Sequence, residues 1–182
     1  MKNNLSILLL LFSFSLFGQN NDTVVKLNGN VANSISNELV IYKFDKSFEI
    51  TVPVEKNGNF TSQFTVKEPG TYFIKQEKSY TTLFLKNGYN LTVNIDTKSF
   101  PNSIKFEGEG SKFNNYLKAK SKLDGDLVGD TKTFFVVPVE DFLKKIAADS
   151  SQMFQQLRDA KLEKEDADLS QKLILYDYLL KE

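Results

Sequence analysis

The chain has 182 residues, with 23 basic and 23 acidic side chains and a formal net charge of zero. It contains no cysteine, no histidine and no tryptophan. Without cysteine there is no disulfide, thiolate nucleophile or thiolate zinc site. Without histidine the commonest general base and the commonest transition-metal ligand are missing. The charge balance gives no attraction to nucleic acid. We therefore expect no catalytic residue, metal site or cofactor, and no nucleic-acid partner.

The N-terminus has the pattern of a secretory signal peptide, which we assign to residues 1–18. A basic start precedes an apolar run from Leu5 to Phe17, which is shorter than the about 20 residues of a membrane span. We expect cleavage between Gly18 and Gln19, and an uncleaved anchor is the alternative. No cysteine follows the apolar run, so a lipid anchor of the bacterial lipoprotein type is excluded. The pattern predicts an exported protein of the periplasm or cell envelope, with no membrane span once the signal is removed.

The next part of the chain, residues 19–110, has the pattern of an antiparallel β-sandwich of about seven or eight strands. Short runs rich in β-branched and aromatic residues are separated by turn residues at a spacing of roughly 8–12 residues, which is typical of sandwiches and barrels. The expected strands are Val24–Val31, Leu39–Phe44, Phe48–Val54, Phe60–Val66, Thr71–Lys75, Thr81–Leu85, Leu91–Ile95 and Ile104–Phe106. Pro53 has no N–H to donate, which favours an edge position for its strand.

Two Lys-Asn-Gly segments, at residues 56–58 and 86–88, each stand between two expected strands and predict hairpins. In the first hairpin, a three-residue loop with a left-handed Gly58 pairs Ile50 with Phe64 and keeps one apolar face. A two-residue loop would mix the faces, so we prefer three residues. For the second hairpin both loop lengths give acceptable pairs, and both remain open.

After Gly110 the apolar period changes from two to about 3.6, which predicts about three helices over residues 111–182. The apolar stripes are Phe113, Tyr116, Leu117 and Leu123, then Val139, Phe142, Leu143, Ile146, Met153, Phe154 and Leu157, then Leu169, Leu173, Ile174, Tyr176, Leu179 and Leu180. The sequence stops at Glu182, directly after an apolar stretch and without the usual helix stop signals. We expect truncation before a further domain, and the alternative is a last helix docked on the sandwich.

The segment from Gly108 to Lys112, Gly-Glu-Gly-Ser-Lys, invites comparison with phosphate-binding loops. A Walker loop needs four residues between its first glycine and Gly-Lys-Ser/Thr, and a dinucleotide fingerprint needs a third glycine where Phe113 stands. The spacing fails both templates. A joint between a strand and a helix accounts for every residue, because Gly110 would end the strand and Ser111 would cap the helix.

We therefore take this joint as the candidate site of the chain. Its residues are Gly108, Gly110, Ser111, Asn114, Asn115 and Tyr116.

Three other chemistries are weaker. Residues 123–130 resemble a calcium loop, but Val128 and Phe135 occupy positions that need oxygen ligands, so a solvated loop between helices is expected. Paired carboxylates such as Glu163 and Glu165 fall in a charge run at a helix start, which suits the helix dipole. Exposed aromatic side chains could stack on sugars, but most aromatics fall at core positions of the expected strands.

The ordered series of motifs resembles the N-terminal region of exported TlpA-like, thioredoxin-fold proteins of Bacteroidetes-type bacteria. The motifs are LVIYKF, VPVEKNGNF, KEPGTYF, LFLKNGYNLTVNID and FEGEGSKFNNYL, and the resemblance extends from Val24 to Leu180. In that family a β-sandwich and a helical segment precede a redoxin domain with a CxxC motif. That domain is absent here, so no catalytic residue is carried over. The resemblance implies a non-catalytic accessory module that positions the redoxin domain, binds its client or mediates dimerisation.

The alternative function is a free-standing exported binding or adhesion protein, in which the helices cover one face of the sandwich. Under either reading the expected partner is a protein: a redoxin domain outside this chain, a client, or a second copy in a homodimer.

Overall fold

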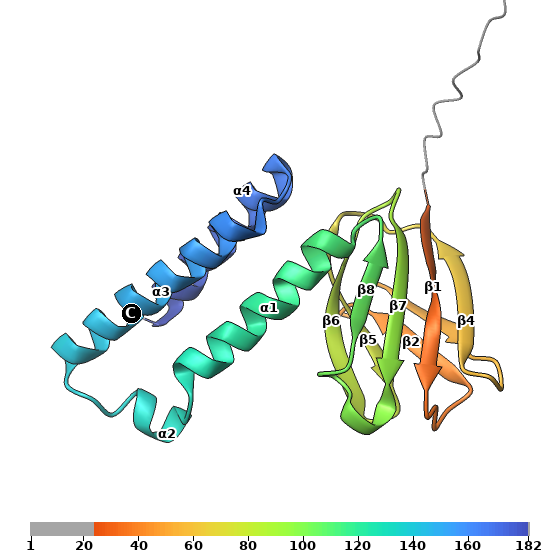
Figure 1. Ribbon diagram of the computed structural model, residues 1–182, viewed down its shortest axis with the longest axis horizontal. Helices are drawn as coiled ribbons and strands as arrows, with labels where there is room; N and C mark the ends of the chain where they lie inside the picture. Colours follow the sequence, from red (N-terminus) through yellow and green to blue (C-terminus); the bar gives the residue numbers. More distant parts are fainter. Residues whose placement is uncertain (1–23, 182) are drawn as a thin grey trace, which may run out of the picture.

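The structure, a computed structural model, describes residues 24–181 and consists of a β-sandwich with a helical arm (Figure 1). The expected signal peptide, residues 1–18, and its cleavage site between Gly18 and Gln19 lie outside the described residues. Figure 1 shows the arm running obliquely away from the sandwich, so that much of its length stands clear of the sheets.

The sandwich contains eight strands in two four-stranded sheets. The strands are β1 (Val25–Ala32), β2 (Glu38–Tyr42), β3 (Glu49–Pro53), β4 (Asn59–Phe64), β5 (Gly70–Gln76), β6 (Ser79–Leu85), β7 (Asn90–Asp96) and β8 (Lys105–Gly108). Sheet A has the order β4-β1-β7-β8 and sheet B has the order β3-β2-β5-β6. The predicted fold class is confirmed, and so is the edge position of the strand that contains Pro53.

The strand pairs are antiparallel except for β1 and β7, which run parallel with Lys26 opposite Asn90. Strand β1 lies between β4 and β7 in sheet A. Both neighbours enter sheet A from sheet B, one on each side of β1, and this crossing places a parallel pair in an otherwise antiparallel sandwich.

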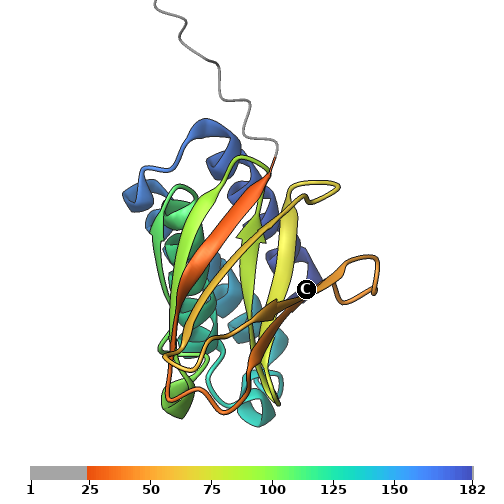
Figure 2. The same ribbon diagram turned by 90° about the vertical axis from the view of Figure 1, so that its right-hand side faces the viewer.

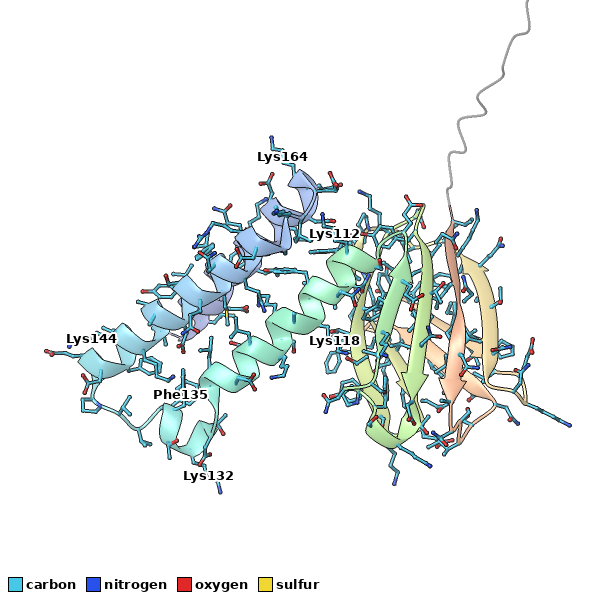
Figure 3. All side chains as sticks on the ribbon, viewed as in Figure 1. Lys112, Lys118, Lys132, Phe135, Lys144 and Lys164 are labelled. Atoms are coloured by element: carbon cyan, nitrogen blue, oxygen red, sulfur yellow. The ribbon has the colours of Figure 1, made fainter. Side chains whose placement is uncertain are left out.

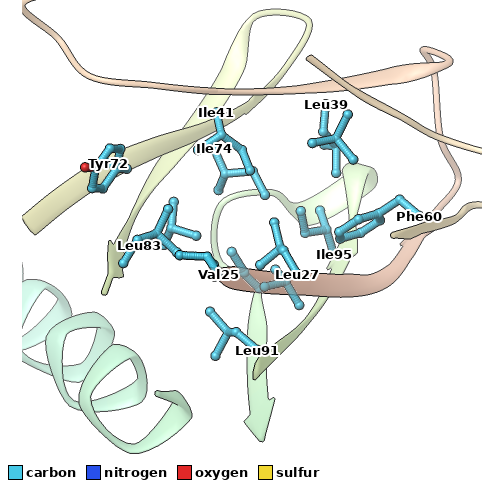
Figure 4. Packing of buried hydrophobic residues seen from close by; sticks show 14 of the residues in the cluster. Val25, Leu27, Leu39, Ile41, Phe60, Tyr72, Ile74, Leu83, Leu91 and Ile95 are labelled. Carbon is cyan, nitrogen blue, oxygen red and sulfur yellow. The ribbon is translucent and has the colours of Figure 1, made fainter. Parts of the chain in front are cut away.

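The core lies between the two sheets and is built from alternate residues of the strands. In β1, Val25, Leu27 and Val31 are buried, and in β2 Leu39 and Ile41 are buried. Figure 4 shows side chains from both sheets meeting in this layer, as expected for two sheets packed face to face. Full burial of one such aliphatic side chain contributes about 1.5–3 kcal/mol. Burial of these alternating side chains is therefore the main source of the sandwich's stability.

The loop of the first Lys-Asn-Gly segment has the predicted three-residue form. The N–H of Gly58 donates to the carbonyl oxygen of Glu55 at 2.8 Å, the N–H of Glu55 donates to that of Asn59 at 2.8 Å, and Gly58 has φ 86°. The prediction that this loop forms a hairpin is wrong, because β3 pairs with β2 and β4 pairs with β1. The predicted pair of Ile50 and Phe64 is therefore not a strand pair, although both side chains pack against the core.

The second Lys-Asn-Gly segment also joins strands of different sheets and forms no hairpin. Gly88 has φ 97°, and the segment connects β6 of sheet B with β7 of sheet A. The side chain of Asn87 accepts from the N–H of Val66 at 2.8 Å and donates to its carbonyl oxygen at 2.8 Å. Each Lys-Asn-Gly loop thus carries the chain from sheet B to sheet A.

The helical arm begins at the end of β8. Its helices are α1 (Ser111–Val128), the short α2 (Thr131–Phe134), α3 (Val139–Ala160) and α4 (Lys164–Lys181), and a single 3₁₀ turn, η1 (Thr97–Ser99), lies between β7 and β8. The three long helices match the prediction. The expected loop at residues 123–130 is wrong in its first part, because α1 continues to Val128, and Gly129, with φ 61°, is its C-cap.

Helix α1 leaves the sandwich along the side where β6 and β8 are the edge strands, and it contacts both of them. Helices α3 and α4 form an antiparallel pair that packs on α1 (Figures 1 and 2). In Figure 2 the helices lie behind the sheets, which places the arm on one side of the sandwich. The start of α4 returns to the sandwich, where the Nζ atom of Lys86 lies 2.5 Å from Oε2 of Glu165.

Candidate functional site at the strand-helix joint

The two glycines of the predicted joint are required by its geometry. Gly108 has φ 82° and Gly110 has φ 92°, a left-handed region that side chains other than glycine disfavour. A Cβ atom at Gly108 would overlap the carbonyl oxygen of Asn90, and one at Gly110 would overlap the ring of Tyr89. The space beside Gly110 is filled by an aromatic ring, which leaves no cradle for a phosphate and agrees with the failed spacing of the phosphate-loop templates.

The predicted capping role of Ser111 is wrong. The N-cap position of α1 is Gly110, no side chain caps the helix there, and Ser111 is the first helical residue. The sequence prediction placed the cap one residue too late, because serine is a common N-cap and Gly110 was assigned to the end of the strand.

Asn114 is the best-satisfied polar residue of the joint and is 2% exposed. Its Oδ1 atom accepts from the N–H of Phe84 at 2.7 Å, and its Nδ2 atom donates to the carbonyl oxygen of Phe84 at 3.0 Å. The same Nδ2 atom donates to the carbonyl oxygen of Gly110 at 3.0 Å. Phe84 belongs to β6, the edge strand of sheet B. Asn114 therefore supplies the edge with the hydrogen bonds that a neighbouring strand would otherwise make.

The next residue, Asn115, makes a matching contact with the other sheet. Its Nδ2 atom donates to the carbonyl oxygen of Phe106 at 3.0 Å, and Phe106 lies in β8, the edge strand of sheet A. One turn further along α1, Lys118 donates to the carbonyl oxygens of Asn102 at 2.8 Å and Ile104 at 2.6 Å. Figure 3 shows Lys118 on the part of α1 that faces the sandwich.

Tyr116 belongs to a small second core that fixes the arm to the sandwich. Its ring stacks with that of Phe113 at 6.3 Å between centroids, and Phe113 meets Phe84 edge-on at 4.8 Å. These three residues are buried. Burial raises the pKa of the Tyr116 hydroxyl above its usual value, and the nearby carboxylate of Asp177 adds to the effect. The six predicted joint residues thus lie close together, and four of them have clear structural roles in the joint: the two glycines, Asn114 and Tyr116.

The acidic first turn of α4 lies beside the joint, close to Tyr89 and Gly110. Burial raises the pKa of Tyr89, and the carboxylates of Asp166, Glu165 and Glu109 act in the same direction. Burial likewise raises the pKa of Asp166. Two open cavities of about 360 Å³ and 350 Å³ adjoin these residues, and Lys86 lines both of them. In residues 24–181 no cluster of three or more potential metal-ligating side chains is placed to hold an ion.

A second surface lies on α4, on the side turned away from the buried Ile174. We call it the α4 outer face; it consists of Leu173, Leu175, Tyr176, Leu179 and Leu180. Leu180 is 85% exposed and Tyr176 is 62% exposed. The apolar stripe of α4 was predicted, but its sequence did not show that the second half of the helix would be apolar on two sides.

A third surface was missed by the sequence reasoning, which placed most aromatics in the core. The outer face of sheet B carries a stripe of aromatic rings, which we call the sheet B stripe; it consists of Tyr42, Phe44, Phe73 and Tyr80. The ring centroids of Tyr42 and Phe73 are 5.3 Å apart, those of Phe73 and Tyr80 are 5.9 Å apart, and Phe44 is 84% exposed. The signal was the alternation of the strands, because Tyr42 follows the core residue Ile41.

The fold and the joint define a β-sandwich protein with a helical arm that packs against the edges of both sheets. Residues 25–117, about half of the chain, match the family model described as domain of unknown function DUF4369, and the chain belongs to this family. The matched region includes the whole sandwich and the first turns of α1. It therefore contains every residue of the predicted joint.

The other comparisons add little. No curated protein matches the chain. A crystal structure of a DUF3823 family protein from Parabacteroides merdae is similar at 18% identity over 42% of this chain, with a TM-score of 0.29. The chain spans only 45% of the length of that protein, and the likeness is too distant to support an argument. None of the helices in residues 24–181 is long and apolar enough to cross a membrane.

Proposed function

We propose that this chain is the non-catalytic N-terminal accessory module of an exported thioredoxin-like thiol–disulfide oxidoreductase. In this proposal the sandwich domain comprises residues 19–110, the helical segment comprises residues 111–182, and a redoxin domain docks on the arm. The order of the sequence motifs supports the assignment. The chain contains no cysteine, so the redox chemistry belongs to the docked domain.

The observation that carries the proposal is the α4 outer face. A helix on the surface of a soluble protein normally turns its apolar stripe to the core and its polar side to water. In α4 the inward side is occupied by Ile174 and Ser170, both fully buried, and the outward side is still apolar from Leu173 to Leu180. A contiguous apolar surface of this kind is typical of a docking site.

The position of this face fits a domain that follows α4 along the chain. The joint holds α1 rigidly to the sandwich, and α4 packs along α3, which packs on α1. A redoxin domain seated on the α4 outer face would therefore be kept at a fixed distance from the sandwich. The chemical role of the module is positional: it orients the redoxin domain and takes no part in the exchange of electrons.

The absence of cysteine makes a sharp cross-linking test available. A Tyr176→Cys variant of residues 19–182 carries a single thiol. The purified chain can be labelled there with a benzophenone maleimide, freed of excess reagent, mixed with an envelope extract of the parent cell and irradiated. We expect a cross-link to a polypeptide segment with a CxxC motif, identified by mass spectrometry. A Glu49→Cys variant, labelled on the exposed edge strand β3, is the control. Equal products from both positions, or products without CxxC segments from Tyr176→Cys, would contradict the proposal.

The second candidate, a free-standing exported binding protein, is favoured by the sheet B stripe. Exposed aromatic rings on the outer face of a sheet are suited to contact with a ligand. This function requires α4 to be a stable part of the isolated chain. Amide hydrogen exchange of residues 169–180 tests this candidate, because a frayed α4 in the isolated chain would contradict it.

A further inference from the structure

Side chains of α1 form hydrogen bonds with the backbone of both edge strands that lie beside it. In β8 and the segment before it, the carbonyl oxygens of Phe106, Ile104 and Asn102 all accept hydrogen bonds from α1 side chains. In β6, Asn114 pairs with the N–H and the carbonyl of Phe84. Helix α1 thus bonds to the edge of sheet A at Phe106 and at two carbonyls before β8, and it bonds to the edge of sheet B only at Phe84.

The direction of the backbone groups in β6 follows from the contact of Phe84 with Asn114. Because both backbone groups of Phe84 point to α1, they point away from β5. In an antiparallel ladder residues two positions apart point the same way, so the N–H and carbonyl groups of Thr82 and Tyr80 also point outward. Among residues 24–181 no hydrogen bond reaches these outward groups. The free edge therefore offers two donors and two acceptors in strand geometry.

A groove of about 740 Å³ lies beside this free edge. Thr81 and Thr82 of β6 form one wall, and Ile104 and Phe106 form part of the floor. The opposite wall is the outer half of α1, from Lys118 to Asp126. The edge strand, the floor and the helix together line an open groove in the size range of specific ligand sites.

We propose that this groove binds an extended peptide segment of a partner protein, which adds to sheet B as a strand along β6. The outward groups of Thr82 and Tyr80 pair with the peptide backbone, which is the geometry of β-augmentation. Asn114 marks the end of the added strand, because it already occupies the position that the peptide would take opposite Phe84. Recognition comes mainly from the peptide backbone, and it selects an extended, unfolded segment.

The groove also sets the side chains that suit it. Alternate side chains of an added strand point to opposite faces. One set meets the floor near Ile104 and Phe106 and is expected to be apolar. The other set lies towards solvent beside Lys122 and Asp126, which form an exposed ion pair at 2.5 Å, and is expected to be polar. This inference is independent of the α4 outer face and of any redoxin domain.

The test uses a peptide with this pattern, acetyl-Lys-Thr-Val-Thr-Val-Thr-Val-Lys-amide, added to the chain from Gln19 onward. We expect binding by calorimetry and slower hydrogen exchange of the Tyr80 and Thr82 amides in NMR spectra. A Thr82→Pro variant removes one outward N–H without removing a bond of the β5–β6 ladder, and it should bind about tenfold more weakly. The matched Thr82→Val variant keeps the N–H and should bind as the unaltered chain does.

Several outcomes would overturn the proposal. One is the absence of binding at millimolar peptide; another is equal binding by Thr82→Pro and Thr82→Val. A third is protection that appears on α4 instead of β6. If the chain without peptide sediments as a dimer that Thr82→Pro dissociates, the edge serves a second copy and not a peptide.

Protection of the inward-pointing Leu83 amide in Thr82→Pro shows that the strand is still folded. Cross-linking from Tyr176→Cys should be unaffected by Thr82→Pro, so failure here is distinguishable from failure of the proposed function.

Discussion

The side chain of Asn114 holds both backbone groups of Phe84, with an N–H to Oδ1 distance of 2.7 Å and an Nδ2 to carbonyl oxygen distance of 3.0 Å. One amide side chain thus takes the place of one residue of a neighbouring strand. This contact is one of several that anchor the helical arm to the sandwich. It also satisfies part of an edge that would otherwise be open to pairing with another chain.

The first prediction concerns this anchor. Asn114→Ala should lower the free energy of unfolding by about 1–3 kcal/mol, because it leaves the buried N–H and carbonyl of Phe84 without partners. Urea unfolding followed by circular dichroism measures the change. Asn115→Ala is the control, because Asn115 is exposed and makes a single hydrogen bond to Phe106; its loss should stay below about 1 kcal/mol. Equal losses would show that Asn114 is not the anchor.

The second prediction concerns the tight joint. Gly110→Ala should destabilise the chain by about 2 kcal/mol or more, because φ 92° is unfavourable for alanine and the new methyl group meets the Tyr89 ring. Combining it with Tyr89→Ala should recover part of the loss, giving a coupling energy above about 0.5 kcal/mol in a double-mutant cycle.

Gly125 provides the matched control for this prediction. It lies inside α1, and no atom lies within 4 Å of a Cβ built there. Gly125→Ala should therefore stabilise the chain by about 0.5–1 kcal/mol through helix propensity. A destabilising Gly125→Ala would show that general disturbance of α1, and not the left-handed position, explains the effect at Gly110.

The third prediction concerns alkaline pH. Burial and neighbouring carboxylates raise the pKa of Tyr89 in the folded chain. The folded state therefore holds the phenol proton more tightly than the unfolded state. This contribution to stability is fully present below the unfolded pKa of about 10 and is lost as pH rises above it. We expect the unfolding free energy to fall above this pH, and Tyr89→Phe should reduce the slope. An unchanged slope in Tyr89→Phe would assign the loss to other groups.

The fourth prediction compares the two sides of α4. Ile174 is fully buried, so Ile174→Ala should cost about 2–5 kcal/mol of stability. Tyr176 lies on the α4 outer face and is 62% exposed, so Tyr176→Ser should change the stability of the isolated chain by less than about 0.5 kcal/mol. Thermal unfolding of the two variants measures the contrast. A large loss in Tyr176→Ser would mean that the outer face is covered within the chain itself.

Much of the secondary structure was predictable because it depends on local periodicity. Each of the eight expected strands is found within a few residues of its predicted ends, and the three expected helices are present. Pro53 lies in the edge strand β3, as its missing donor required. The end of α1 was misjudged, because the aspartates and Gly125 near it are turn-forming residues that the packed helix tolerates.

The candidate site was predictable only in part. Glycine spacing located the joint, because Gly108 and Gly110 take backbone conformations that few other residues adopt. The partners of Asn114 and Asn115 could not be found in the same way. Both contacts join residues distant in the sequence, and an asparagine carries no local signal of the strand that it will meet.

The sequence by itself determined which residues face the core, because alternation along a strand decides which side chains are buried. Only the tertiary structure decided which strands pair. The two Lys-Asn-Gly loops have the local form of hairpin turns, yet each joins strands of different sheets. Almost every residue offers the same backbone N–H and carbonyl groups, so these groups do not specify which strands pair. Strand partners depend instead on how the apolar faces of the strands pack together. The same closure left β6 with a free edge beside α1 and placed an apolar face of α4 on the outside of the molecule.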